Sequence, residues 1–354
     1  MRFEPKGLTL NVEGKATPGF TLFSPLYRHD TYLIDLEGEI VHQWRHSDRI
    51  GSYARLLPNG NLLSSLDGGA TPEGILPRGG IIREVDWDGN VVWERRDDLQ
   101  HHDMRRLPNG NTVYLAWELL SEENASRVRG GVPGSEHPDG IYGELVREVS
   151  PEGDLVWEWR AQEHMVIEDW PIPPVLPRAE WGHSNAVVPV GEDGYLVGFR
   201  DFNLLAVIDK KTNGLSWQLR NLEWGLPHDP HFLDNGNLML FANRVGQMPL
   251  GSKVLEMNPD DGSVIWEYSA RPHHSFSSPF ISGSQRLASG NTLICEGLWG
   301  CIFEVTPGGE IVWEYVNPFT AEWNEGPLLG PVGALFRAYR YAGDSPEIGG
   351  RLGA

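Results

Sequence analysis

The sequence has few cysteines, fewer basic than acidic residues, and no long hydrophobic run. Two cysteines in 354 residues cannot form the disulfide framework that stabilises small secreted domains. The formal charge of -20 repels polyanions and argues against a nucleic-acid partner. No stretch approaches the roughly 20 apolar residues of a membrane span, and the first residues do not read as a secretion signal. We therefore expect a cytoplasmic protein that has no membrane partner.

Tryptophan and glycine are abundant, with 14 and 42 residues, and 40% of the chain is hydrophobic. This composition provides enough apolar area for a packed core and is not typical of a disordered chain. Cys295 and Cys301 flank a short apparent hairpin, so a disulfide between them is one reading of this pair. Free thiols are the reading that we favour, because disulfides are rare outside oxidising compartments.

One sequence motif recurs six times along the chain: an apolar strand, a turn with glycine, and a second apolar strand that ends near tryptophan. A second hairpin, with an Asn-Gly or similar turn as in RLPNGNTVYL at 106–115, lies between most copies. Each repeat unit therefore holds four strands, and we expect the tryptophans to pack in the core or between units. The turn glycines and their tryptophans are Gly38 with Trp44, Gly89 with Trp93, Gly153 with Trp157, Gly214 with Trp217, Gly262 with Trp266, and Gly309 with Trp313.

Four short strands repeated six times predict an all-β fold, a six-bladed β-propeller that forms one domain over residues 1–354. The sixth blade combines strands near 19–45 with a C-terminal strand at 334–342, so N- and C-terminal strands share one blade and leave no open sheet edge. Two stacked sheets of three units each are the alternative. The five continuous blades are predicted at 52–95, 102–159, 183–219, 228–268 and 282–315.

The antiparallel order of strands sorts the connections between two faces of the ring. One face has only tight turns, whereas the long irregular segments fall on the other, where function is expected. The segment 160–182 is rich in proline, and we expect it to lie across the mouth of the channel and to shape substrate choice. The four long segments are 119–144, 160–182, 269–281 and 316–332.

The inner strands of five units can be aligned on the apolar residue that precedes their turn. Histidines from three consecutive blades then share one register, so we expect them to meet at the loop-bearing mouth of the channel. Arg200 and Arg244 end the paired strands and reach the same face. Histidines beside arginines suit an anion. The aligned residues, five places before the apolar residue, are Ser52, His102, His183, His228 and Ser282.

Each of these residues also has a structural alternative: a histidine can be a hydrogen-bonded residue of the channel wall, and an arginine can pair with a carboxylate. Four further histidines, His101, His231, His273 and His274, are placed near the mouth, and we expect them to be peripheral to the chemistry. The candidate substrate contacts are Arg244, Ser282, Ser284, His231 and His274.

Five segments carry a resemblance to a known family: HHDMRRLPNGNT (101–112), EWGHSNAV (180–187), LPHDPHFLDNGN (226–237), SFSSPFISGSQRLASGNTLICEG (275–297) and FRAYRY (336–341). Together they resemble the arylsulfotransferase family of six-bladed propellers, over nearly the whole chain. The resemblance implies transfer of a sulfuryl group from an aryl sulfate to a phenol through a histidine, without a nucleotide, a metal or another cofactor. It implies that His228 is the nucleophile, and that His102, His183 and Arg200 bind the sulfuryl oxygens and assist the phenolic oxygens. A further hydroxyl contact is implied near Ser282 and Ser284.

Two other functions fit the same residues. Three neutral imidazoles with open coordination positions can hold Zn²⁺ or another divalent ion, which would make a metal-dependent hydrolase or lyase. His102, His183 and His228 would then be the metal ligands. A binding propeller without chemistry is the other alternative. The expected partner in each case is a small aromatic or anionic molecule.

Overall fold

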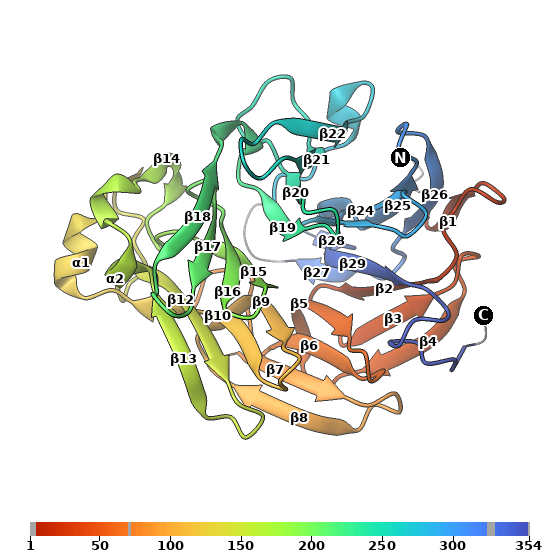
Figure 1. Cartoon of the computed structure of the whole chain (residues 1–354), viewed down its shortest axis with the longest axis horizontal. Helices are drawn as coiled ribbons and strands as arrows, with labels where there is room; N and C mark the ends of the chain where they lie inside the picture. Colours follow the sequence, from red (N-terminus) through yellow and green to blue (C-terminus); the bar gives the residue numbers. More distant parts are fainter. Residues whose placement is uncertain (1–4, 70–71, 324–329, 353–354) are drawn as a thin grey trace.

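The computed structural model describes residues 5–69, 72–323 and 330–352 of the chain. Within these residues, six antiparallel sheets stand in a ring around a central channel (Figure 1). The innermost strand of each sheet contacts the innermost strands of both neighbouring sheets, all the way round the ring. The protein is therefore a six-bladed β-propeller, as the repeat predicted, and the alternative of two stacked sheets is wrong.

Five of the six blades are continuous in sequence, and each runs from the channel outward. Blade I contains β5 (Arg49–Leu56), β6 (Leu62–Asp67), β7 (Gly80–Val85) and β8 (Val91–Arg96). Blade II contains β9 (Gln100–Arg106), β10 (Thr112–Leu119), β12 (Tyr142–Val149) and β13 (Leu155–Arg160). Blade III contains β15 (Ser184–Val190), β16 (Gly194–Phe199), β17 (Leu204–Asp209) and β18 (Leu215–Arg220). Blade IV contains β19 (His228–Phe232), β20 (Leu238–Ala242), β21 (Lys253–Met257) and β22 (Val264–Tyr268). Blade V contains β23 (Gly283–Arg286), β24 (Thr292–Glu296), β25 (Cys301–Val305) and β26 (Ile311–Val316).

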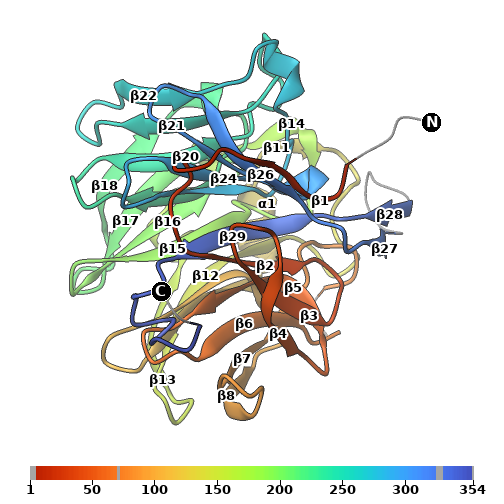
Figure 2. The same ribbon diagram turned by 90° about the vertical axis from the view of Figure 1, so that its right-hand side faces the viewer.

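The sixth blade joins the two ends of the chain. Its inner strand is β29, which pairs with β2 so that Tyr341 lies opposite Phe20 (Figure 2). The split blade predicted from the sequence is thus confirmed. Blade V gains a fifth strand that was not predicted, since β1 pairs along the outer edge of β26. The strands concerned are β29 (Leu335–Tyr341), β2 (Phe20–Pro25), β3 (Asp30–Ile34), β4 (Ile40–Arg45) and β1 (Gly7–Asn11).

Tryptophan side chains tie each blade to the next. The outer strand of every blade carries a tryptophan whose indole N–H donates to a turn of the following blade, mostly to a backbone carbonyl. These bonds run round the whole ring and explain why tryptophan recurs with the repeat. They are Trp93 to Pro151, Trp157 to Asn213, Trp217 to Pro259, Trp266 to Pro307, Trp313 to Leu36 and Trp44 to Asp86.

The long connections gather at one mouth of the channel. Two of them pair with each other through β11 and β14, which run parallel with Gly130 opposite Ile172. The connection 316–332 includes residues 324–329, which lie outside the described residues. The short elements of this face are α1 (Glu122–Arg127), β11 (Gly130–Val132), α2 (Ala161–His164), η1 (Ile167–Asp169), β14 (Ile172–Pro177), η2 (Leu222–Trp224), η3 (His273–Ser275), η4 (Gly297–Trp299), β27 (Ala321–Trp323) and β28 (Gly330–Val332).

The cysteines are both free thiols: Cys295 is buried in β24 and Cys301 is partly buried at the start of β25. Among the described residues, no helix is long and apolar enough to cross a membrane.

Candidate active site

Bulges in the inner strands orient the histidines of the site. The register of β9 against β10 shifts between His101 and Met104, and β15 and β19 shift at their mouth ends in the same way. His102 and His183 have positive φ angles of 47° and 48°, a conformation that few residues with a side chain adopt. A bulge turns a side chain out of the regular pleat. The shared register seen in the sequence therefore corresponds to a shared local distortion.

A cavity of about 520 Å³ lies at the loop-bearing mouth, and we call it the loop-side cavity. His102, His183, His228 and Arg200 all line it. The structure therefore brings together the four residues that the sequence predicted as catalytic. Apolar side chains from the inner strands and loops supply much of the remaining wall, and one carboxylate joins them. These residues are Leu26, Ile75, Phe280, Ile281, Phe336 and Glu180.

Three of the four predicted loops contribute to the wall of the loop-side cavity: 119–144 through Ser135 to Pro138, 160–182 through Pro177 to Glu180, and 269–281 through Phe280 and Ile281. A loop that the sequence analysis did not single out, between β6 and β7, adds residues 73–77. The proline-rich segment 160–182 thus lies beside the cavity, and its effect on substrate choice stays a prediction.

His102 and His183 belong to a continuous chain of hydrogen bonds. The Nδ1 atoms of His101 and His102 are 2.7 Å apart, and the Nε2 atoms of His102 and His183 are 3.0 Å apart. His183 Nδ1 lies 2.9 Å from Glu180 Oε1. At the other end, His101 Nε2 is 3.4 Å from Glu144 Oε2. Among the described residues neither His101 Nε2 nor the Glu144 carboxyl oxygens make a hydrogen bond, so the hydrogen bonds run from Glu180 through His183 and His102 to His101.

The chemistry of neutral imidazole fixes the direction of this chain. The rings of His102 and His183 each have one N–H donor and one acceptor nitrogen, so these two rings donate in the same direction. When Glu180 is ionised, the rings donate toward it. When Glu180 carries a proton, it donates to His183, and His183 and His102 then donate away from Glu180, toward His101. One proton can thus pass from Glu180 to His183 without any side chain moving.

Burial sets the charges in the loop-side cavity. Desolvation, together with the positive charge of Arg200, lowers the pKa of His183 to about 3. Desolvation likewise holds the pKa values of His102 and His228 well below the usual range, so all three imidazoles are neutral at pH 7. Desolvation raises the pKa of Glu180 to about 7, against the opposing effect of Arg200. A carboxyl group with this pKa can both hold and release a proton near neutral pH.

His228 has a defined tautomer. The Asn243 amide nitrogen donates to the carbonyls of Ser278 and Ile281, at 2.8 and 3.0 Å, so its oxygen must face His228. His228 Nδ1 lies 2.8 Å from that oxygen and therefore carries the proton. The lone pair is on Nε2, which accepts the Ile281 backbone N–H at 3.2 Å. His228 is thus a neutral imidazole held in one orientation.

Arg200 supplies positive charge to the loop-side cavity. Its Nε and Nη2 contact Asp201 at 2.8 and 2.7 Å, and its backbone N–H donates to the His183 carbonyl at 3.2 Å. Asp201 is 4% exposed, and burial raises its pKa. This pairing holds the guanidinium in place while Nη1 makes no hydrogen bond with the described residues. A fixed guanidinium with a free donor suits an anionic group.

The predicted substrate contacts do not gather around the histidines. Arg244 donates to the Met248 carbonyl at 3.3 Å outside the wall of the loop-side cavity, and His274 is exposed on η3. The hydroxyl of Ser282 is buried and accepts the Gly297 N–H at 2.9 Å. Ser284 and His231 line a separate cavity at the opposite mouth. The structure therefore separates all five from the loop-side cavity.

Sequence reasoning missed three residues that support the histidines. His101 was expected to be peripheral to the chemistry; it is fully buried, and its Nδ1 lies 2.7 Å from that of His102. Glu180 and Asn243 were not singled out, although each has a visible signal. Glu180 precedes His183 by three residues, and Asn243 ends the strand that pairs with the strand of His228.

The geometry does not suit the three-histidine metal alternative. His228 Nε2 is engaged by a backbone N–H, and its Nδ1 carries a proton. His102 and His183 direct their Nε2 atoms at each other. Over residues 5–69, 72–323 and 330–352, no group of three or more His, Cys, Asp or Glu side chains is arranged to hold a metal ion.

Fold and site together define a β-propeller with a buried cluster of histidines and an arginine at one mouth of its channel. A sequence model of the arylsulfotransferase (ASST) family matches residues 53–318, and the chain belongs to this family. Membership supports an arylsulfotransferase-like function and suggests a transferase. No curated protein matches the sequence.

Two solved structures are similar to the fold. A protein of unknown function from Bacteroides caccae has a TM-score of 0.57 and 14% sequence identity, over 91% of this chain and 98% of that chain. A streptogramin B lyase has a TM-score of 0.50 and 12% identity, over 88% of this chain and 82% of that chain. At these identities the likeness shows the propeller fold alone.

Proposed function

We propose that the protein transfers a sulfuryl group from an aryl sulfate to a phenolic acceptor, and that the group is bound covalently to His228 between the two half-reactions. The observation that carries this proposal is the neutral, oriented imidazole of His228 in the same cavity as Arg200. The family match supports the reaction class, and the apolar wall around Phe336 suits an aromatic ring.

In the first half-reaction, His228 Nε2 attacks the sulfur atom and the bond between sulfur and the phenolic oxygen breaks. His228 Nδ1 keeps its proton and donates it to the Asn243 side-chain oxygen, which stabilises the positive charge that develops on the ring. The attack displaces the Ile281 N–H from Nε2, and this donor then becomes available to a sulfuryl oxygen. Arg200 stabilises the negative charge on the sulfuryl oxygens.

The departing phenolate takes a proton from His183 Nε2, and Glu180 replaces that proton at Nδ1. In the second half-reaction the acceptor phenol returns its proton along the same path, and its oxygen attacks the sulfur bound to His228. The imidazole is thereby released, and the proton count is restored. The reaction so written needs neither a nucleotide nor a metal.

The test is an assay of purified protein with 4-nitrophenyl sulfate and a phenol acceptor, with and without chelator. We expect nitrophenol release that survives chelation and is lost in His228→Ala. His274→Ala, an exposed change on the same face, should keep the activity. Rapid quenching without acceptor should give a peptide that contains His228 and is heavier by one sulfuryl group. Full activity in His228→Ala, or a sulfuryl group found on another residue, would contradict the proposal.

A further inference from the structure

A second cavity, of about 710 Å³, opens at the opposite mouth of the channel, and we call it the turn-side cavity. It is lined by the inner strands and by the turns that follow β19 and β23. It shares no lining residue with the loop-side cavity. The function proposed above does not use it.

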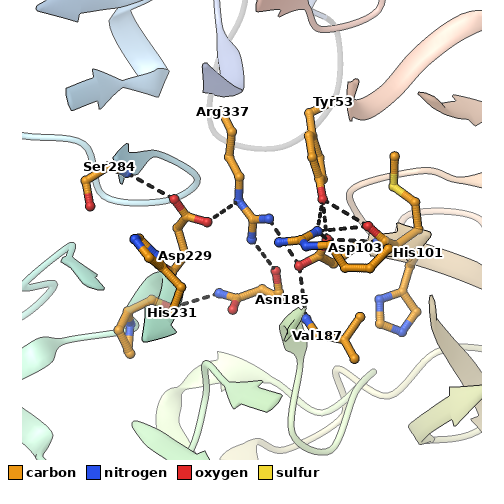
Figure 3. A network of polar contacts seen from close by, with 12 residues as sticks. Tyr53, His101, Asp103, Asn185, Val187, Asp229, His231, Ser284 and Arg337 are labelled. Carbon is orange, nitrogen blue, oxygen red and sulfur yellow. Dashed lines mark hydrogen bonds and ion pairs between the residues drawn. The ribbon is translucent and has the colours of Figure 1, made fainter. Parts of the chain in front are cut away.

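Arg337 separates the two cavities. Its side chain is 1% exposed and projects from β29 across the channel (Figure 3). The guanidinium contacts Asp103 of blade II at 3.1 Å, the Asn185 carbonyl of blade III at 3.0 Å and Asp229 of blade IV at 3.0 Å. One side chain from blade VI therefore bridges three other blades. The turn-side cavity is a compartment of its own.

Around Arg337 and on its turn side, the positively charged side chains outnumber the carboxylates that they contact. Three guanidinium groups, those of Arg55, Arg105 and Arg337, face the two carboxylates of Asp103 and Asp229. Arg105 pairs with Asp103, and Arg337 pairs with both carboxylates. Arg55 has no ion pair among the described residues, and its guanidinium lies 4.4 Å from the centre of the Tyr339 ring. These five groups thus include one more guanidinium than carboxylate, and Arg55 is the guanidinium that has no carboxylate of the described residues in direct contact.

The other titratable groups of the turn-side cavity do not supply the missing negative charge. Glu256 pairs with Arg286 at 2.6 Å, so the two charges cancel. Asp234 is exposed on its turn, where water screens it. Desolvation lowers the pKa of His231, which is therefore neutral at pH 7.

Two buried hydroxyl groups line the turn-side cavity without partners. Tyr339 is 5% exposed and Ser284 is 3% exposed, and neither side-chain oxygen has a hydrogen-bond partner among the described residues. Buried hydroxyl groups are nearly always hydrogen-bonded, so these two point to a group that the chain does not supply. The Ser284 backbone N–H is already used, since it donates to Asp229 at 3.0 Å.

We propose that the turn-side cavity binds a small oxyanion between the Arg55 guanidinium and the hydroxyl groups of Tyr339 and Ser284. An oxyanion neutralises the surplus charge and accepts from both hydroxyls at once. A carboxylate and an inorganic oxyanion share this chemistry, and the experiment separates them.

The test has two parts. Diffraction from crystals soaked in sodium selenate locates the bound ion by the anomalous signal of selenium. Calorimetric titration with selenate and with acetate measures the affinity for each ion. We expect an anomalous peak between Arg55 and Tyr339, apart from any peak at Arg200. Arg55→Gln should weaken binding at this site by about tenfold or more, and Tyr339→Phe by about threefold. Lys211→Gln, an exposed change of the same charge, serves as the control and should leave the affinity unchanged.

Competition between the two probes identifies the class of ligand: tighter acetate binding at this site indicates a carboxylate, and tighter selenate binding an inorganic oxyanion. The proposal would be overturned if no anomalous peak appeared at Arg55 and if acetate did not bind at this site either. Equal losses of affinity in Arg55→Gln and Lys211→Gln would also overturn it, because binding would then reflect net charge alone. Tyr339→Phe removes a single oxygen and keeps the test interpretable if Arg55→Gln does not fold.

Discussion

The Nε2 atoms of His102 and His183 lie 3.0 Å apart, so a single proton lies between the two rings. Because both rings are neutral, the ring that donates depends on whether Glu180, at the end of the chain, carries a proton. The pKa of Glu180, raised to about 7 by burial, places this choice within the physiological range. The hydrogen-bonded chain can therefore deliver a proton to the loop-side cavity in one state and accept one in the other.

The first prediction concerns Glu180 and the pH dependence of turnover. Above pH 7 Glu180 is ionised and cannot replace the proton that His183 gives to the phenolate. We expect kcat/KM for phenyl sulfate to fall as pH rises through about 7, and Glu180→Gln to remove this inflection. With 4-nitrophenyl sulfate, whose phenolate leaves without a proton, the inflection should be weaker. An inflection that persists in Glu180→Gln would assign it to another group.

The second prediction concerns Arg200. Replacing it with methionine removes a charged donor from the developing sulfuryl charge, which should lower kcat by about 10²–10³-fold. Arg200→Lys keeps the charge and loses the paired contact with Asp201, so its loss should be smaller. The measurement is steady-state kinetics with 4-nitrophenyl sulfate. An unchanged kcat with a raised KM would instead assign Arg200 to substrate binding alone.

The third prediction concerns stability against acid. The pKa values of His183 and His46 are lowered by burial, from 6.5 to about 3 and about 4. Their contribution to stability is complete above pH 6.5 and is lost as pH falls toward the folded-state values. Each neutral histidine adds up to about 1.4 kcal/mol per pH unit to the dependence of the unfolding free energy.

Urea unfolding between pH 5 and pH 7 measures this dependence. Glu180 acts in the opposite direction, because its raised pKa gives stability below pH 4.5 that is lost as pH rises through about 7. Comparing the slopes of two proteins removes this offset. His46 does not line the loop-side cavity, and His46→Gln should reduce the slope of unfolding free energy against pH relative to the unchanged protein. Equal slopes would mean that folding does not lower the pKa of His46.

The fourth prediction concerns Arg337. Arg337→Met leaves Asp103 and Asp229 buried without their shared counter-ion, and should lower the unfolding free energy by about 3–5 kcal/mol. Arg351→Met, at an exposed position, is the matched control. Adding Asp103→Asn and Asp229→Asn to Arg337→Met should recover part of the loss. No recovery would indicate that packing rather than charge determines the role of Arg337.

The repeat made the fold predictable from the sequence. Turn glycines such as Gly110, whose φ is 88°, and the tryptophan that ends each outer strand mark every blade. The strand β1 was not predicted, because GLTLN belongs to no repeat unit and pairs only with the finished edge of β26. A pairing of this kind depends on tertiary structure.

The site was only partly predictable. His102, His183 and His228 share a register, and register decides which strand residues reach the mouth. His231 was misplaced because it lies three residues further along β19, and about 3.3 Å of rise per residue carries it toward the turns. His101 and Glu180 were missed because their contacts depend on side-chain directions that the bulges set, and no periodic pattern records those directions.

The inner strand of the closing blade is the last strand of the described chain. While residues 335–341 are still inside the ribosome, β2 has an unpaired inner edge and Asp103 and Asp229 have no Arg337 between them. The nascent chain can therefore assemble blades I to V, but it cannot complete blade VI and the channel until synthesis has passed Tyr341. Translation of a messenger RNA truncated before the codon for Tyr341 would produce an open ring with an exposed β edge and with the buried charges of Asp103 and Asp229 unpaired by Arg337. Protein quality control would recognise such a form.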